Sequence, residues 1–329
     1  MPSDGFTENK SFYKLNFITL GTKMTMQPSR IFDILSNVVQ AHPLERCLSD
    51  KKNGVWESYS TEKFFESANY ISAALLSEGV KPLDKIALIS TNNRSEWSIV
   101  DMAILQIGAI SVPLYPNISS KDYEYILNHS ESIYCFVSDQ NLFNKVISVK
   151  KQVKRLKEIY CFDELDDCKN WTELLEIGKE DWDEKKLDKT KSIVEASDLA
   201  TIIYTSGTTG TPKGVMLTHS NIVSNVISAT KKFPFEDRNQ TALSFLPMCH
   251  IFERTFIYGY LYNSIEVYFA ESLETIADNL REIKPNFMTA VPRLLEKVYD
   301  KIYAKGNDLK GIKKSLFFWA VEIGLKYNP

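Results

Sequence analysis

Apolar residues follow two different spacings along this chain, and the two spacings alternate. Short runs of consecutive apolar residues, bounded by turn residues, predict buried strands over residues 85–90, 133–138 and 265–270. Apolar residues three and four positions apart predict amphipathic helices, such as those over residues 30–40 and 121–129. Strands that alternate with helices are typical of an α/β fold, so we expect mostly parallel sheets flanked by helices.

The same patterns predict the remaining elements. Short strands are expected over residues 55–60, 202–204 and 215–217, and helices over residues 61–76, 220–231, 273–284 and 310–327. Ser60 or Thr61 is the expected cap of the helix that begins there. A strand that runs into a helix is expected over residues 286–299, with Arg293 in the first turn of that helix.

One segment, residues 97–116, is long and apolar enough to raise the question of a transmembrane helix. Asp101 and Gln106 interrupt its apolar character, while Gly108 and Pro113 break its regularity. A helix followed by the strand AISVPLY therefore fits this segment better than a membrane span does.

Two other segments bear on domain organisation. Residues 145–191 are highly charged, which is typical of a solvated helix and linker, and they mark a candidate domain boundary. Residues 1–27 are polar, with Asp4 and Glu8 near the start and no sustained apolar core, so they do not form a signal peptide. We interpret residues 1–27 as an N-terminal extension and hold disorder there as a hypothesis.

Composition excludes several classes of protein. The chain has 329 residues, of which 44% are hydrophobic and 25% charged, as expected for a soluble globular protein with one large domain or two. A net charge of −3 provides no basic surface for nucleic acid. The five cysteines form no CxxC pair, so neither a disulfide framework nor a zinc site is indicated, and a reducing cytoplasm fits best.

The stretch TIIYTSGTTGTPKGVMLTH, residues 201–219, carries the clearest chemical signal. An apolar strand breaks into a loop of serine, threonine and glycine, and a second apolar strand follows. Glycine permits positive φ and close approach of a ligand, and hydroxyl groups with one ammonium group suit a polyphosphate. The candidate ATP-binding residues are Thr205, Ser206, Gly207, Thr208, Thr209, Gly210 and Lys213.

Other interpretations of this stretch are weaker. A P-loop NTPase needs adjacent Gly and Lys followed by Ser or Thr at a helix start, whereas Pro212 precedes Lys213 and Gly214 follows it. A solvated turn between two strands is the usual fate of such composition. Instead, the stretch resembles, almost residue for residue, the phosphate-loop signature of adenylate-forming enzymes, a group that includes acyl-CoA synthetases, luciferases and peptide-synthetase adenylation domains.

A second motif, LPMCHIFER, contains Cys249 and His250. The two residues are adjacent, and neighbours on an extended segment point to opposite faces, so a catalytic Cys–His pair is not favoured. Together with TAVPRLLEKVY, this motif is similar to segments of long-chain fatty acyl-CoA synthetases. The resemblance implies that His250 is a wall residue of the adenylate site and that the second segment lies beside an acyl tunnel. For Glu253 and Arg254 an ion pair that fixes the following helix is favoured over substrate contact.

The resemblance covers roughly residue 28 to the C-terminus and implies ATP-dependent conversion of a long-chain fatty acid to acyl-AMP, followed by transfer to coenzyme A. It implies that Lys213 and His250 serve catalysis, that Mg²⁺ accompanies ATP, and that Thr205 helps to hold the metal. Residues 28–329 would then be an incomplete large N-terminal, AMP-binding domain with its phosphate loop at residues 204–214.

The family's later signatures are not found in this sequence. They include the adenine-binding segment, the aspartate that holds the ribose, and the C-terminal domain with its catalytic lysine. We therefore expect a truncated portion that is poorly active or inactive. Two alternatives stay open: an adenylating enzyme for an aryl or amino acid, and a non-catalytic nucleotide-binding module.

The C-terminal pattern adds one further expectation. Apolar residues at helical spacing form a stripe flanked by lysines; they are Ile312, Leu316, Trp319, Ala320 and Ile323. Packing of the stripe on its own domain is favoured, with a membrane interface as the alternative. The predicted location is thus the cytoplasm, with peripheral contact at the inner membrane surface left open. Neither acyl chain length nor oligomeric state follows from the sequence.

Overall fold

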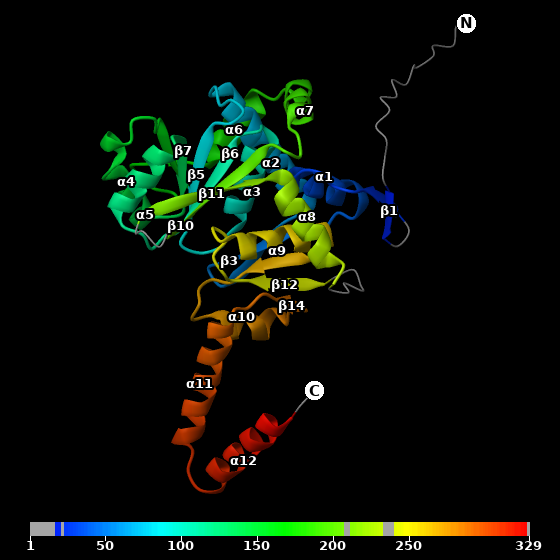
Figure 1. Cartoon of the computed structure of the whole chain (residues 1–329), viewed down its shortest axis with the longest axis vertical. Helices are drawn as coiled ribbons and strands as arrows, with labels where there is room; N and C mark the ends of the chain where they lie inside the picture. The colour runs from blue at the N-terminus through cyan, green and yellow to red at the C-terminus, as the bar shows by residue number, and fades with distance from the viewer. Residues whose placement is uncertain (1–16, 21–22, 207–210, 233–239, 328–329) are drawn as a thin grey trace, which may run out of the picture. The chain divides into compact units, whose positions relative to one another are not determined.

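The computed structural model describes residues 17–20, 23–206, 211–232 and 240–327. The chain divides into two compact units, the first ending at Phe287 and the second beginning at Met288. The first unit contains two large β-sheets and the helices that pack on them (Figure 1). The predicted α/β fold with mostly parallel sheets flanked by helices is confirmed.

The larger sheet has seven strands in the order β11-β10-β6-β5-β7-β8-β9. Its strands are β5 (Lys85–Ile89), β6 (Ile110–Leu114), β7 (Ser132–Val137), β8 (Glu158–Cys161), β9 (Lys169–Asn170), β10 (Leu199–Ser206) and β11 (Pro212–Thr218). All neighbours are parallel except β10 and β11, which are antiparallel. Strands β5, β6 and β7 are buried on both faces, which explains why each reads as a continuous apolar run.

The second sheet has five strands in the order β14-β12-β13-β3-β4. Its strands are β3 (Leu48–Lys52), β4 (Val55–Tyr59), β12 (Thr241–Ser244), β13 (Glu266–Phe269) and β14 (Phe287–Met288). Strand β3 was not predicted from the sequence, because the segment LSDKK carries little apolar signal. Asn53 and Gly54, with φ of 50° and 80°, make the tight turn that pairs β3 with β4.

Ten helices of the described chain belong to the first unit. They are α1 (Ile31–Ala41), α2 (Thr61–Ser77), α3 (Ser95–Gln106), α4 (Ser120–His129), α5 (Gln140–Ile147), α6 (Thr172–Glu180), α7 (Glu184–Ile193), α8 (His219–Thr230), α9 (Ile251–Tyr262) and α10 (Ile276–Ile283). The predicted cap of α2 is confirmed, since Ser60 Oγ accepts the Lys63 N–H at 3.1 Å.

Helix α3 lies between the two sheets (Figure 1). It contacts β5 and β6 in the larger sheet and β3 in the smaller one, and every residue of the helix is buried. This double burial is the physical reason for the strong apolar character of the segment. No helix among the described residues is long and apolar enough to cross a membrane.

Two expectations about boundaries differ from the structure. Residues 145–191 lie wholly inside the first unit and contribute the buried strand β8, so they are not a domain boundary. Part of the predicted N-terminal extension forms an antiparallel pair of strands, β1 (Phe17–Leu20) and β2 (Lys23–Met26). Residues 1–16 and 21–22, for which disorder was the hypothesis, lie outside the described residues.

The second unit consists mainly of α11 (Pro292–Asp308) and α12 (Ile312–Lys326). Helix α11 begins at Pro292, which places Arg293 in its first turn as predicted. The two helices meet where the ring of Phe317 packs against Gly306, a position without space for a Cβ. Within the second unit the predicted stripe on α12 does not pack against α11: Ile312 is 87% and Trp319 59% accessible, and other side chains of α12 make the contacts with α11.

Candidate functional site

The hydroxyl-rich stretch folds as the hairpin of β10 and β11, which we call the phosphate hairpin. Its register pairs Thr205 with Lys213 and Ser206 with Pro212. Composition had indicated that Thr205, Ser206 and Lys213 belong to the loop, whereas all three lie in the strands. Regular cross-strand pairing extends further toward the turn than local composition indicated. The candidate residues Gly207, Thr208, Thr209 and Gly210 lie outside the described residues.

Thr205 and Lys213 form a directly opposed pair on the phosphate hairpin. Side chains of opposed residues in an antiparallel pair project from the same face, so a hydroxyl and an ammonium group stand side by side. Both residues are exposed. Within the part of the chain that the structure describes, the Lys213 ammonium group makes no ion pair or hydrogen bond. The pair can therefore meet an anionic group from solvent.

Helix α4 holds the phosphate hairpin from one side. The Tyr204 hydroxyl and His129 Nδ1 are hydrogen-bonded at 2.7 Å. The Tyr125 hydroxyl donates to the Pro212 carbonyl at 3.4 Å, and its ring stacks on His129 with centroids 5.4 Å apart. These contacts flank the Thr205–Lys213 pair on both strands. Tyr125 and His129 were not singled out from the sequence, because nothing local links α4 to a strand far along the chain.

The motif LPMCHIFER joins β12 to α9. His250 is the N-cap of α9, where its Nδ1 accepts the Phe252 N–H at 3.2 Å, and its side chain is exposed. Cys249 is buried, and burial raises the pKa of its thiol to about 12. A thiol that stays protonated at neutral pH is a poor nucleophile, which agrees with the rejection of a Cys–His pair.

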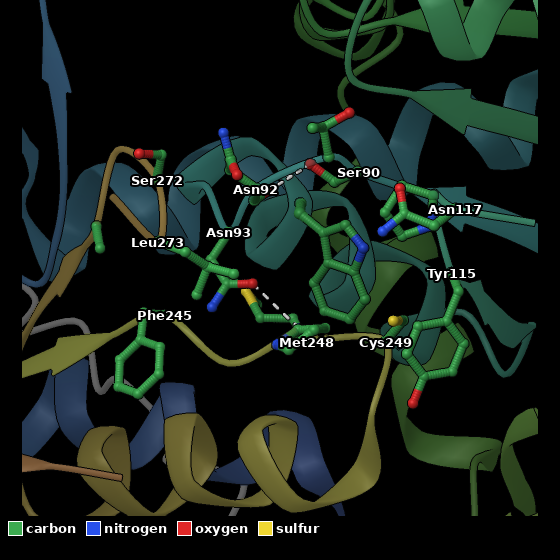
Figure 2. A pocket seen from close by; sticks show the side chains of 15 residues that line it. Ser90, Asn92, Asn93, Tyr115, Asn117, Phe245, Met248, Cys249, Ser272 and Leu273 are labelled. Carbon is green, nitrogen blue, oxygen red and sulfur yellow. Dashed lines mark hydrogen bonds between the residues drawn. The ribbon is translucent and has the colours of Figure 1, made fainter. Parts of the chain in front are cut away.

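A small cavity lies behind this motif, at the carboxyl ends of β5, β6, β12 and β13 (Figure 2). Its volume is about 160 Å³, and the described residues that line it include Trp97, Tyr115, Met248 and Cys249 but no charged residue. Ligands of open α/β sheets bind outside the carboxyl ends of the strands, so this position is typical of a binding site.

Asn93 shapes one wall of the cavity. Its Nδ2 donates to Ser244 Oγ at 2.8 Å and to the Leu246 carbonyl at 2.7 Å. Its Oδ1 accepts the Met248 N–H at 3.1 Å, the contact drawn in Figure 2. One amide therefore fixes the backbone on both sides of Pro247. Asn93 was missed at the sequence level, although its place in a turn directly after a predicted strand is a usable signal.

A second, larger pocket of about 470 Å³ lies between β11, α8 and α9, and we call it the apolar pocket. Most of its lining is hydrophobic, including Val215, Leu217, Ile222, Val226, Ile251, Phe252, Phe256 and Tyr260. Its α9 wall begins directly after His250, and its β11 wall begins two residues after Lys213. The two predicted catalytic residues, Lys213 and His250, are therefore close in sequence to residues that line the same pocket.

A family model described as "AMP-binding enzyme" matches residues 35–323. The chain belongs to this family.

Relatives of this family share both sequence and fold with the chain. The human long-chain-fatty-acid–CoA ligase ACSBG2 is 28% identical over 290 residues, which cover 85% of this chain and 43% of the relative. The structure of a long-chain-fatty-acid–CoA ligase, FadD1 from Archaeoglobus fulgidus, superposes with a TM-score of 0.70 at 22% identity, covering 89% of this chain and 56% of that one. This chain spans less than half the length of the curated relative.

The fold is shared with adenylating enzymes for other carboxylates. The anthranilate–CoA ligase AuaEII, solved with anthranoyl-AMP, superposes with a TM-score of 0.63 at 18% identity, covering 79% of this chain and 48% of that one. At this identity the likeness concerns the fold alone.

The resemblance of the phosphate loop predicted a divalent metal that accompanies ATP. Among the described residues, no three His, Cys, Asp or Glu side chains come together to hold a metal ion. Magnesium is commonly held by substrate phosphates and water with few protein ligands, so exposed hydroxyls beside a lysine suit an ion that arrives with ATP. A direct role of Thr205 in holding the metal remains a prediction.

Proposed function

We propose that this chain forms the ATP- and carboxylate-binding part of an AMP-forming long-chain fatty acid–CoA ligase. The observation that carries the proposal is the alternation along β11. Lys213, Val215 and Leu217 are two residues apart in a strand and so share one face. Val215 and Leu217 line the apolar pocket. One strand face therefore presents a cation for phosphate or carboxylate and, next to it, a wall for a hydrocarbon chain.

The chemistry follows from this arrangement. A carboxylate oxygen of the fatty acid attacks the α-phosphorus of ATP, the bond to pyrophosphate breaks, and acyl-AMP forms. The thiol of coenzyme A then attacks the acyl carbonyl, and AMP leaves. Negative charge moves onto pyrophosphate in the first step, where Lys213 and hydroxyl donors stabilise the transition state more than the ground state. Mg²⁺ bound with ATP supplies further charge neutralisation at the phosphates.

His250 has a supporting role in this proposal. It caps the amino end of α9, the end at which the helix dipole is positive. The residues that follow it, Ile251 and Phe252, line the apolar pocket. A fatty acid lying in that pocket would place its carboxylate near the His250 end, where the positive end of the helix favours it.

The substrate class can be tested on the 329-residue chain by a chain-length series. Burial of each methylene stabilises binding by about 0.8 kcal/mol, so the affinity of saturated fatty acids should rise about fourfold per carbon until the pocket is full. Fluorescence displacement measures this slope. Preferential binding of aryl carboxylates or amino acids, with no slope, would support the second candidate, an adenylating enzyme of the kind that shares this fold.

Nucleotide binding needs a separate experiment. Calorimetric titration with Mg·ATP should show binding that Lys213→Ala weakens roughly ten- to hundredfold, the usual effect of losing a hydrogen bond to a charged group. Lys326→Ala, at an exposed lysine in the second unit, is the matched control. ATP binding without any carboxylate binding would favour a non-catalytic nucleotide-binding module. Fatty-acid-dependent ATP–pyrophosphate exchange then measures the first half-reaction, for which we expect little or no turnover by this chain alone.

A further inference from the structure

A buried ion pair lies between the two sheets. Arg254, in the first turn of α9, donates to both carboxylate oxygens of Asp101 on α3, from Nη2 to Oδ1 at 2.5 Å and from Nε to Oδ2 at 3.2 Å. The side chains are 0% and 1% exposed. Tyr258, one turn further along α9, accepts from Arg254 Nε at 2.8 Å and donates to the same carboxylate. Both charges are thus paired and hydrogen-bonded inside the protein.

The guanidinium has a third partner on the phosphate hairpin. Arg254 Nη1 donates to Thr201 Oγ1 at 2.8 Å, and Thr201 Oγ1 donates in turn to the Ser111 carbonyl at 2.7 Å. Thr201 is fully buried in β10, four residues before Thr205. One side chain of α9 is therefore bonded to the strand that carries the phosphate-binding residues.

The neighbouring residue ties the same helical turn to the other sheet. Glu253 is fully buried and accepts from Ser244 Oγ at 2.6 Å, and Ser244 ends β12. Ser244 Oγ in turn accepts from Asn93, which also holds the backbone before His250. The Arg254 N–H donates to the His250 carbonyl at 3.2 Å, so His250 belongs to this turn as well. The first turn of α9 is thereby bonded to both sheets.

Stability alone does not account for a buried ion pair. Desolvation of the two charges offsets most of their attraction, and apolar replacements of similar size are often neutral or stabilising. The guanidinium instead fixes the orientation of the groups it binds, because its donors lie in a rigid planar fork. Catalysis that depends on the proximity of two reactants needs a fixed geometry, since a displacement of about 1 Å between reacting groups can lower the rate on the order of a hundredfold.

We propose that Arg254, held by Asp101, is a positioning residue that fixes the His250 end of α9 relative to the phosphate hairpin through Thr201. The distance between the His250 end of α9 and the phosphate hairpin then stays constant while substrates bind and dissociate. The functional meaning of this link rests on the proposed function; the mechanical link itself rests on the hydrogen bonds of Arg254, Asp101 and Thr201.

The link can be cut by a substitution that keeps both members of the ion pair, Arg254 and Asp101. Thr201→Val keeps the shape of the side chain and removes the oxygen that Arg254 contacts, whereas Thr201→Ser keeps that oxygen. Ser72→Ala is the matched control, because Ser72 is also fully buried and donates to a backbone carbonyl, that of Ala103, at 3.0 Å. All variants are made in the 329-residue chain and followed by hydrogen exchange with mass spectrometry.

Without ligand, Thr201→Val should speed hydrogen exchange about tenfold in both β10 and the first turn of α9. Thr201→Ser and Ser72→Ala should leave the ratio of the exchange rates of these two segments as it is in the wild-type chain. With Mg·ATP, the wild-type chain should gain protection in the first turn of α9 as well as in β10. In Thr201→Val only the protection of β10 should remain.

Two results would overturn the proposal. One is faster exchange in β10 alone without ligand. The other is ATP-induced protection of α9 that persists in Thr201→Val. Failure of the wild-type chain to bind Mg·ATP would instead refute the proposed function, and the ligand-free comparison would still decide whether the link exists.

Discussion

The ring of Tyr204 lies across Gly214, its partner on the opposite strand of the phosphate hairpin. A Cβ at position 214 would stand 3.3 Å from Tyr204 Cζ and 2.8 Å from Ile202 Cγ2. Gly214 lies in regular strand β11 without a positive φ, so close approach rather than backbone freedom explains this glycine. The sequence predicted positive φ and close approach of a ligand, whereas the groups that approach Gly214 are side chains of its own hairpin.

Gly214→Ala should therefore disturb the phosphate hairpin. Relief of the clash moves Ile202 or Tyr204, which we expect to lower the free energy of unfolding by about 1–3 kcal/mol and to weaken Mg·ATP binding. Denaturant unfolding and calorimetry measure the two effects. Gly324→Ala serves as control, because a Cβ at that helical glycine meets no described atom within 4 Å and alanine favours the helix. Equal stability of Gly214→Ala and wild type would show that the contact is unimportant.

Gly259 is a position from which a side chain can enter the apolar pocket. It lines the pocket from within α9, and a Cβ there meets no atom of the described chain within 4 Å. Gly259→Leu should keep the fold, reduce fatty acid binding at least about tenfold and leave Mg·ATP binding intact, because the new side chain occupies the space proposed for the acyl chain. Displacement of a fluorescent fatty acid measures the first effect, and Gly324→Leu is the same substitution at a helical glycine that does not line the pocket. Unchanged fatty acid affinity in Gly259→Leu would place the acyl chain elsewhere.

His219 should make stability depend on pH. It is 1% exposed at the start of α8, where its Nδ1 accepts the Ile31 N–H at 3.3 Å. Burial lowers its pKa from 6.5 to about 4. Between these values the unfolded chain binds a proton that the folded chain does not, so stability falls as pH drops from 6.5 toward 4, by about 3 kcal/mol in all.

Urea denaturation at about pH 7 and at about pH 4.5 measures how the free energy of unfolding depends on pH, because these two values span most of the range between the two pKa values. In His219→Gln the amide oxygen can still accept from Ile31, but no proton is taken up, so the pH dependence should be smaller than in wild type. His250→Gln leaves the buried acceptor in place and should retain the wild-type slope. An identical slope in His219→Gln and wild type would refute the assignment.

Cys249 should be chemically inert in the folded chain. Its burial and the raised pKa of its thiol keep the thiolate population low at neutral pH. Iodoacetamide treatment followed by peptide mapping should label Cys249 only after denaturation. Burial also raises the pKa of the Cys168 thiol to about 12, but this side chain is partly exposed, so Cys168 is the internal comparison for access alone. Cys249→Ser should bind Mg·ATP as wild type does. Rapid labelling of Cys249 in the native chain would instead support a catalytic Cys249–His250 pair.

Contiguous sequence patterns were enough to predict several elements of this protein and its family. The phosphate hairpin was predictable because its glycines, hydroxyls and flanking apolar strands are contiguous, from Thr201 to His219. The helices α2, α4 and α8 were predictable for the same reason, since caps and amphipathic spacing act within a few residues. Family resemblance rested on such contiguous motifs, and the family was confirmed.

Only the tertiary structure decided what depends on distant partners. The polar segment LSDKK became strand β3 because β13 and β4 supply its hydrogen bonds. Arg254 was expected to pair within its own motif, but its carboxylate partner, Asp101, lies 153 residues earlier in the chain. Packing brings such groups together through the sheets and the helices between them. A local pattern cannot encode that proximity, because it records spacing along the chain rather than distance through the core.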